Sequence, residues 1–337
     1  MLLLVEIRAI RGKKNRHDIP SQPLSSAPMP SKKAYIEFCE ANNDIPLFMR
    51  PYWLDAVAGV KGWDAILSRN TEGKIVGAWA LHHRKLKGFK AIVLPPMTPF
   101  TGIYLDVDDA LPVQKQALQR QEILEDLISQ VPDVTVFEQK FQYTLQDWTP
   151  FYWEGYKQET RYTFRFTKPD PEAIYANFTK SFQRNLRAAE REFRVEKSTD
   201  VTELYRLIQN VYKLREEEIG FTFETLNAAY STVHALGQST IYRAMDGDEV
   251  SSAILTVHDA HTTYYLLGGR AGSNTRNSTN LLLWHAIRDA AERGHDFDFE
   301  GSMIKGVHRF FQSFGGEMVP YHFVYRYLGI GKVRYLR

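Results

Sequence analysis

The chain has 337 residues, a length that predicts two domains. Hydrophobic residues make up 44% of it, which is enough for packed cores and excludes a disordered protein. The net charge is only +2, so any polyanion site must be a local patch, and the single cysteine excludes an intrachain disulfide and any multi-cysteine metal site. A single thiol is typical of a reducing compartment.

The N-terminal 33 residues predict a flexible tail. Met1–Val5 is too short and lacks the basic leader of a secretory signal, and residues 11–33 are basic and then rich in proline and serine. The natural start of the chain is therefore expected downstream of Met1. A helix-like run from Ala34 to Ala41 follows, and it contains Cys39 as a packed thiol. No apolar run reaches the roughly 18 residues that span a bilayer, so no integral membrane segment is expected.

Residues 34–167 predict a first domain. A hairpin with its turn at Asn70–Gly73 comes first, and later a helix over Val113–Ser129 leads into a strand over Val134–Phe137. Between them, the proline-rich segment Leu94–Gly102 suits either the floor of a cleft or a surface connection. His82 and His83 lack ligand-like spacing, so no metal site is predicted.

Residues 168–337 predict a second domain that repeats this order. Lys168–Pro171 breaks the preceding strand and begins a helix. A second hairpin turns at Asp246–Asp248, and a helix over Thr279–Arg293 leads into the strand at Asp296–Phe299. The coarse match of the two orders predicts a duplication, and two unrelated α/β domains are the alternative.

The stretch from Lys180 to Arg194 predicts an amphipathic helix. Its cations recur at intervals of four, three, four and three residues, which places them on one stripe of an α-helix. Arginine binds phosphate with paired hydrogen bonds, so the stripe favours an anion site; a solvated face and pairing with acids elsewhere are the alternatives. The five cations are Lys180, Arg184, Arg187, Arg191 and Arg194.

Residues 262–321 predict strand, glycine turn, helix, strand, helix and strand in close succession. The strand Thr262–Leu267 leads into the turn Gly268–Gly272, and a helix follows. Free backbone N–H groups of that turn are expected to hold an anion or an oxyanion; a tight turn that only needs positive φ is the alternative. The turn, the basic helix and the acidic strand at Asp298–Glu300 are expected to converge on one cleft.

Three segments resemble one family in the family's own order. Arg184–Glu190 is similar to the R-N-x-R-x-A-E signature of Fem-type peptidoglycan-bridge aminoacyltransferases and their acetyltransferase-like relatives. Asp298–Gly301 resembles their D-F-x-G strand, and Gly306–Glu317 resembles their G-x-x-x-F-K-x-x-F-G-G-E segment. The resemblance is firm over residues 175–325 and looser over residues 35–165.

The resemblance implies a mixed α/β (α+β) fold with two tandem GNAT-like domains, each a mostly antiparallel sheet flanked by helices. It also implies transfer of an amino acid from aminoacyl-tRNA, or an acyl group from coenzyme A, to an amine. The sequence departs from the family in three ways. Phe311 replaces the lysine of F-K, Arg276–Leu281 lacks the glycine of the coenzyme A loop R-x-x-G-x-A, and no coiled-coil arm is present.

Acyl transfer to an amine requires a base and oxyanion donors. Asp298 and Glu300 alternate on a strand and share its face, so one of them is a candidate to bind the ammonium or accept its proton; capping a helix or pairing with Arg309 is the alternative. Tyr265 is a candidate to protonate the leaving group, or else a core ring, and His308 is a second proton-transfer candidate. The residues expected to bind substrates are Lys180, Arg184, Asn185, Arg187, Arg191, Gly268, Gly269, Arg270, Arg276, Lys305 and Phe311.

The function expected is an N-acyltransferase that acts on an amine of a cell-envelope precursor or a related amino-sugar or peptide. Acyl-CoA or aminoacyl-tRNA is the expected co-substrate, with no tightly bound cofactor. The expected location is the cytoplasm or the inner face of the membrane. A catalytically silent protein that binds an anionic glycan or nucleotide is the alternative. RNA binding by the basic helix is disfavoured by the modest net charge.

Overall fold

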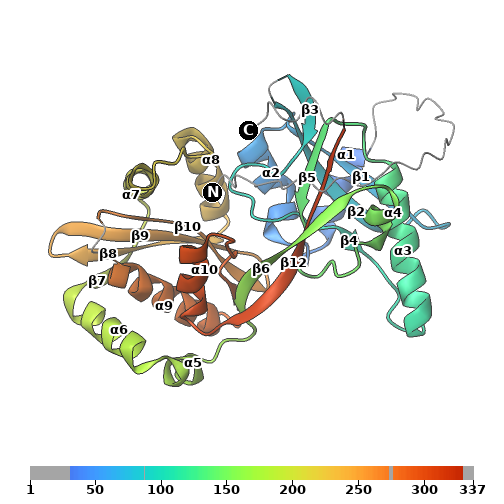
Figure 1. Cartoon of the computed structure of the whole chain (residues 1–337). Coiled ribbons are helices and arrows are strands. Elements are labelled where there is room, and N and C mark those ends of the chain that lie inside the picture. Colours follow the sequence, from blue (N-terminus) through green and yellow to red (C-terminus); the bar gives the residue numbers. More distant parts are fainter. Residues whose placement is uncertain (1–30, 87, 273–275, 329–337) are drawn as a thin grey trace, which may run out of the picture.

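The computed structural model describes residues 31–86, 88–272 and 276–328 (Figure 1). The predicted tail lies outside the described residues as far as residue 30, whereas Ser31–Lys33 already belong to helix α1 (Ser31–Ala41). Cys39 is buried on α1, and burial raises the pKa of its thiol to about 11, so the prediction of a packed thiol is confirmed.

One sheet of twelve strands runs through both halves of the molecule (Figure 1). Its order is β1-β2-β3-β5-β12-β6-β11-β10-β9-β8-β7, with β4 paired to β2. Among the named strands of the described residues, only β3–β5 and β10–β11 pair in parallel, so the prediction of a mixed, mostly antiparallel sheet is confirmed. The strands are β1 (Trp63–Arg69), β2 (Ile75–Leu86), β3 (Phe89–Ile92), β4 (Tyr104–Leu105), β5 (Val136–Lys140), β6 (Lys157–Phe166), β7 (Arg194–Ser198), β8 (Ser239–Asp246), β9 (Glu249–His258), β10 (Thr262–Arg270), β11 (Asp296–Asp298) and β12 (Glu317–Tyr327).

The helices form an outer layer on each half and an inner layer between the halves. Helices α3 and α4 cover the outer face of the first half, and α5, α6, α9 and α10 cover that of the second. Helices α1, α2, α7 and α8 contribute to the core between them. The bounds are α2 (Pro51–Ala58), α3 (Val113–Ser129), α4 (Thr149–Trp153), α5 (Pro171–Asn177), α6 (Lys180–Glu192), α7 (Val201–Leu214), α8 (Phe223–Ala235), α9 (Arg276–Glu292) and α10 (Lys305–Gln312), with a 3-10 turn η1 (Leu47–Met49).

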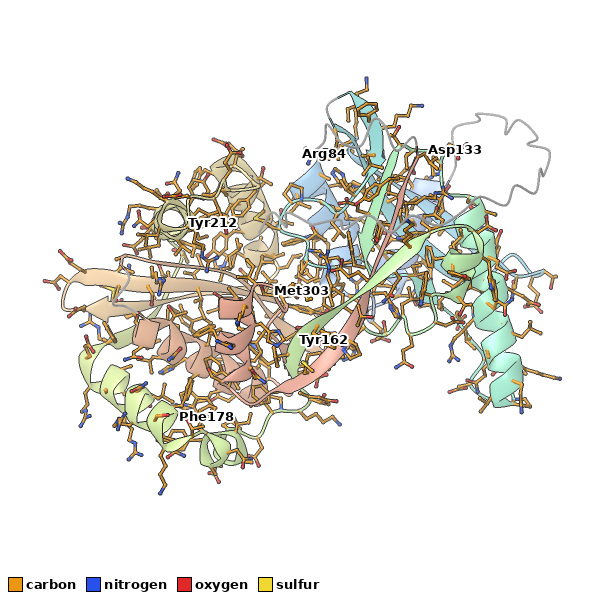
Figure 2. The ribbon with its side chains drawn as sticks, viewed as in Figure 1. Arg84, Asp133, Tyr162, Phe178, Tyr212 and Met303 are labelled. Carbon is orange, nitrogen blue, oxygen red and sulfur yellow. The ribbon has the colours of Figure 1, made fainter. Side chains whose placement is uncertain are left out.

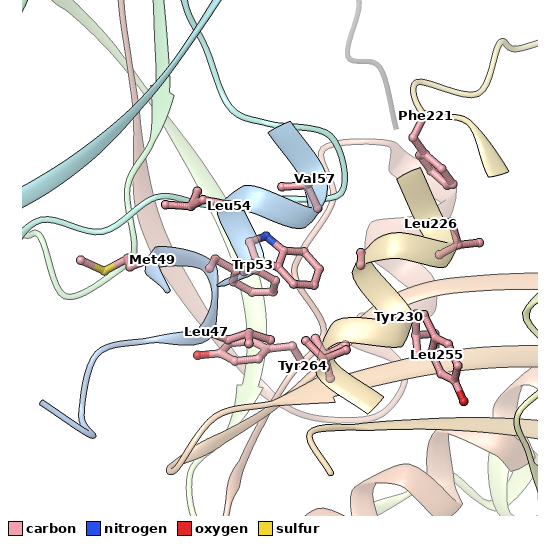
Figure 3. Close-up of a cluster of buried hydrophobic side chains, with 14 of the residues drawn as sticks. Leu47, Met49, Trp53, Leu54, Val57, Phe221, Leu226, Tyr230, Leu255 and Tyr264 are labelled. Atoms are coloured by element: carbon pink, nitrogen blue, oxygen red, sulfur yellow. The ribbon is translucent and has the colours of Figure 1, made fainter. Parts of the chain in front are cut away.

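The two halves share a single inner core. Trp53 of α2 is fully buried and lies beside Tyr230 of α8 and Tyr264 of β10 in one cluster (Figure 3). The carboxylate of Asp259 adds a polar link, because it accepts hydrogen bonds from the Leu47 N–H at 3.2 Å and the Tyr264 hydroxyl at 2.8 Å. The halves therefore pack as parts of one body.

The last strand of each half lies beside a strand of the other half. Strand β6 ends the first half and pairs with β11, whereas β12 ends the second half and pairs with β5. Strands β6 and β12 also pair with each other from Glu317↔Arg165 to Tyr325↔Lys157. The division predicted at residues 167 and 168 falls between β6 and α5 in the sequence, but the sheet is not divided there.

The order of elements within the two halves repeats as predicted. The hairpins β1–β2 and β8–β9 match, and each is followed by a parallel pair joined through a helix of 17 residues, α3 or α9. Parallel strands need such a crossover because a tight turn reverses the direction of the chain and can therefore join only antiparallel neighbours. Among the helices of the described ranges, none has both the length and the apolar character needed to cross a bilayer.

Candidate active site

Strands β10 and β11 diverge soon after they meet. Their parallel pairing covers Thr262–Tyr264 on β10 and ends at Tyr264↔Asp298. Beyond that point β10 continues to Arg270 with β9 as its partner, after a register shift between Tyr265 and Leu267. Among the described strands, none pairs with the second edge of β10 from Tyr265 to Gly269. That edge can pair with an extended ligand through backbone hydrogen bonds.

The predicted glycine turn is wrong for its first three residues, because Gly268, Gly269 and Arg270 belong to β10. Gly268 pairs with Ile254 and Gly269 with Ala253. A Cβ on Gly269 would lie 2.3 Å from the backbone N of Ile208 on α7, so this glycine is required by close packing. Residues 273–275 of the expected loop and the side chain of Arg276 lie outside the described residues.

Asp298 is buried at the end of β11 with both oxygens engaged. Its Oδ1 accepts hydrogen bonds from the Thr163 hydroxyl at 2.5 Å and the Glu300 N–H at 2.8 Å. Its Oδ2 lies 3.3 Å from Nε of Arg165. Burial raises the pKa of Asp298, and the Thr163 hydrogen bond and Arg165 oppose that rise. Asp298 is therefore fixed in place by β6.

Glu300 differs from Asp298 in having an oxygen without a partner. Its Oε1 is buried and accepts no hydrogen bond from the described residues. Burial, and then the negative charge of Asp298, raise the pKa of Glu300 well above its ordinary value. The backbone of Glu300 has φ of 63°, and a residue other than glycine in this region costs about 1–3 kcal/mol. The site maintains a strained, protonatable carboxyl group.

Gly301 allows this strained turn to lie against β6. Its φ is 60°, and a Cβ there would lie 2.2 Å from the carbonyl oxygen of Tyr162. No larger residue fits without moving the backbone of β6 or of the turn. The sequence D-F-x-G thus contributes an acid on the strand, an acid on the turn and the glycine that permits the turn.

The charges around Glu300 do not balance when all are ionised. Asp298 and Asp259 raise its pKa, and Lys140 and Arg165 lower it. With Glu300 itself, three carboxylates face two cations, and Arg165 is also 3.0 Å from Asp296. Lys140 is half-buried, and burial, followed by the charge of Arg161, lowers its pKa to about 8. With Glu300 protonated, the charges of Asp298 and Asp259 are matched by those of Lys140 and Arg165.

A small cavity of about 20 Å³ opens among these groups. Its volume suits one water molecule or one terminal ammonium group. The first half contributes Pro99 and Phe100 of the proline-rich segment, which confirms that this segment lines a cavity. The lining residues are Pro99, Phe100, Phe141, Gln142, Tyr143, Thr163, Asp298, Glu300 and Tyr321.

The basic stripe does not join this site, contrary to the predicted convergence. The apolar face of α6 packs toward the segment after α10, with the Phe182 and Phe314 rings 5.0 Å apart. The cations lie on the opposite face of α6 and are exposed. Helix α6 also ends at Glu192, so Arg194 begins β7, where it pairs with Glu196 at 2.8 Å. The apolar face is confirmed, and the shared cleft is wrong.

The other residues predicted for the site are spread over β10, α10 and α6. Tyr265 begins the unpaired edge of β10, where its ring packs edge-on against Phe311 and burial raises its pKa to about 12. Phe311 is in the outer core of the second half rather than on a surface. His308 packs against the Phe164 ring, and Lys305 is exposed at the start of α10. Asn185 is exposed on α6.

The sequence reasoning missed the cations that balance the acids. Arg161, Thr163 and Arg165 alternate on β6, and Lys140 ends β5. Arg161 is buried over the Phe323 ring at 3.8 Å, and Arg165 over the Tyr143 ring at 3.9 Å. Polar residues that alternate with aromatic ones from Arg161 to Phe166 were the available signal.

Comparisons with known proteins agree with this geometry. Residues 176–312 match the family model described as Acetyltransferase (GNAT) domain. No curated protein matches the chain. The structure of FemX is similar with a TM-score of 0.59, at 12% identity over 91% of this chain and 98% of FemX.

Two further structures are similar over most of their length. One is the C-terminal domain of a putative lysylphosphatidylglycerol synthetase from Agrobacterium fabrum, with a TM-score of 0.54 and 11% identity over 91% of this chain and 96% of that chain. The other is a conserved protein of unknown function from Bacteroides thetaiotaomicron, with a TM-score of 0.56 and 10% identity over 88% and 97%. Residues 176–312 thus match the GNAT acetyltransferase domain, and the chain as a whole shares the fold of the FemX structure.

Proposed function

We propose that this protein is an N-acyltransferase in which Glu300 holds and deprotonates the acceptor amine. The observation that carries the proposal is the buried Oε1 of Glu300, which has no partner within the described residues and lines a cavity of ammonium size. An ammonium there would offset the negative charge of Glu300 when its carboxyl group is ionised. The resemblance to Fem-type enzymes supports a peptidoglycan precursor or a related amino-sugar or peptide as the acceptor.

The unpaired edge of β10 is the proposed place for the acyl donor. A donor arm that pairs with this edge beyond Tyr265 would bring its carbonyl group to the end of β11, next to Glu300. Holding both reactants in line can supply about 7–11 kcal/mol of the barrier. Acyl-CoA and aminoacyl-tRNA both carry an extended arm, and the choice between them is left to experiment.

In the proposed reaction, Glu300 and Tyr265 carry the proton transfers. Glu300 accepts one proton from the ammonium, the free amine attacks the donor carbonyl, and the bond to the thiol sulfur or ribose oxygen breaks. The nitrogen gives its second proton to the phenolate that Tyr265 becomes on protonating the leaving group, so the net reaction leaves one proton on Glu300 for release to water. Tyr265 is the candidate to protonate that leaving group, because burial raises its pKa to about 12 and keeps it protonated near neutral pH. Its hydroxyl lies over Gly268, where a Cβ would be only 2.3 Å from it, so the missing side chain leaves the hydroxyl room.

The test is product formation from purified protein with acetyl-CoA or charged tRNA and a UDP-linked peptide amine, followed by mass spectrometry. Glu300→Gln should lower kcat about 10²–10⁴-fold, because the amide cannot accept the proton. The matched control Glu249→Gln changes an exposed acid of the β8–β9 hairpin and should leave turnover unchanged. Turnover of Glu300→Gln at the wild-type rate would disprove the role of Glu300. Binding of a glycan or nucleotide without product from any donor would favour the silent alternative.

A further inference from the structure

Helix α6 carries a row of cations that the proposed active site does not use. Lys180, Arg184, Arg187 and Arg191 are all exposed and recur at intervals of four, three and four residues. None of the four has an acidic group within 4.0 Å in the described parts of the chain. Like charges at this spacing repel each other. A partner that brings negative charge would relieve the repulsion.

The orientation of the row follows from the packing of α6. Phe182, Leu186 and Ala189 are buried in the outer core of the second half, so the opposite side of the helix faces solvent. Side chains ending in nitrogen extend outward from α6 at the edge of the molecule (Figure 2). A partner can therefore reach the row while the carboxylate cavity between the halves stays free.

The geometry of the row fits a flat array of phosphates. From Lys180 to Arg191 it extends ~16 Å along a straight helix axis. Three of the four cations are arginines, which bind phosphate oxygens in pairs. The single aromatic ring of α6, that of Phe182, is buried in the core, so the exposed face of this helix has no ring on which the bases of single-stranded RNA could stack. It also has no apolar side chain to insert between lipids.

We propose that the exposed face of α6 docks the protein on the anionic surface of a lipid bilayer through phosphate headgroups. Clusters of four or more lysines and arginines on a helix are attracted to such surfaces by the negative charge of the lipid headgroups. The contact is electrostatic, and salt therefore weakens it. It is independent of the proposed chemistry, because none of the four cations lines the carboxylate cavity.

The experiment is flotation of the full chain with vesicles. Vesicles of phosphatidylcholine with about one third phosphatidylglycerol should carry the protein at low salt and release it in 0.5 M salt. Vesicles of phosphatidylcholine alone should not carry it. Equal binding to both compositions, or no binding to either, would overturn the proposal.

Two matched double variants assign the contact to α6. Arg184→Gln with Arg187→Gln should weaken binding to the anionic vesicles about 25-fold, since each cation near the surface contributes about a fivefold factor. Lys115→Gln with Arg120→Gln removes the same charge from the exposed side of α3 and should change binding little. Equal losses in both variants would show a net-charge effect and overturn the assignment. Retention of the α6 variant's melting temperature would show that its loss of binding is not unfolding.

A second experiment tests whether the exposed face of α6 binds nucleic acid instead of a lipid surface. Bulk tRNA is added at the same low salt, and its binding is measured by fluorescence anisotropy with both double variants. If tRNA binding depends on Arg184 and Arg187 and the protein does not float with anionic vesicles, the membrane proposal is wrong and the α6 face binds nucleic acid. Flotation that persists in the presence of excess tRNA would support the membrane assignment.

Discussion

The parallel pairs β3–β5 and β10–β11 hold equivalent places in the two halves but end on different side chains. Strand β5 ends at Lys140, and β11 ends at Asp298 just before the turn with Glu300. The charges of Lys140 and Glu300 act on each other across the junction. One half thus contributes the acids and the other a cation, although both are built on one scaffold. The comparison teaches that the same order of elements supplies the framework in both halves, and that the chemistry depends on which residues follow the paired strands.

Removal of the central cation should have one of the largest effects on stability. Arg165→Met leaves the buried Asp298 and the partly exposed Asp296 beside an apolar side chain, and breaking a buried pair in this way costs about 3–5 kcal/mol. The control Lys74→Met breaks the Lys74–Asp106 pair on the surface of the first half and should cost far less. Urea unfolding of both variants measures the difference. Equal midpoints would show that the acid cluster of the second half is not the tighter network.

The shared inner core can be tested at Trp53. Trp53→Ala should lower the free energy of unfolding by about 3–5 kcal/mol, because its ring is fully buried between the halves. Trp153→Ala changes an exposed tryptophan on α4 and is the matched control. Tryptophan fluorescence and far-UV circular dichroism should report the same transition. Two separate transitions in the wild-type protein would show that the halves unfold independently.

A pair of glycines compares strand-to-helix packing in the two halves. Gly269→Ala should cost about 1–3 kcal/mol, since the added Cβ meets the α7 backbone at 2.3 Å. Gly77→Ala should cost less, because its nearest atom at 2.4 Å is a methyl group of Ile123 that can move. Thermal melting of both variants gives the order. If Gly77→Ala lowered the melting temperature more than Gly269→Ala, the packing of β2 against α3 would be tighter than that of β10 against α7.

The smallest expected effects are pH slopes of opposite sign. The pKa of Glu300 is raised above the ordinary 4.5, so the folded state binds its proton more tightly and stability falls as pH rises above that value. Glu300→Gln should therefore gain in melting temperature over wild type at neutral pH, and the gain should vanish below pH 4.5.

Lys140 gives the converse slope. Its pKa is lowered from 10.5 to about 8, so the cost of its buried charge is present below pH 8 and disappears as pH rises toward 10.5. Lys140→Met should be more stable than wild type at pH 7, and the difference should shrink above pH 8 and vanish above pH 10.5. A difference that is constant from pH 6 to 11 would contradict the shift.

Local patterns predicted the elements that local forces decide. Helix α3 begins at Val113 and ends at Ser129 as its pattern predicts, and the Asn70–Gly73 turn closes the first hairpin. Phe297 and Asp298 take opposite faces of β11, as alternation requires. In these segments the side chains that decide the structure are neighbours in the sequence.

The failures occurred where a distant segment decides the structure. Gly268 and Gly269 read as a turn, yet they lie in a strand because α7 approaches too closely for a side chain. The role of Lys140 depends on a carboxyl group 160 positions away, which no window of the sequence contains. The pairing of β6 with β11 and of β12 with β5 likewise depends on the order of strands in the whole sheet. These features are determined by contacts between the two halves, which local propensity does not contain.

The placement of β12 sets a schedule for biosynthesis. Strand β5 leaves the ribosome first, but the strand that covers its free edge begins at Glu317. At ~5–20 residues per second, roughly 10–40 s pass between them. During that interval the edge of β5 is open to pairing with another nascent chain. Slower translation of the second half should therefore raise the burden on chaperones more than slower translation of the first.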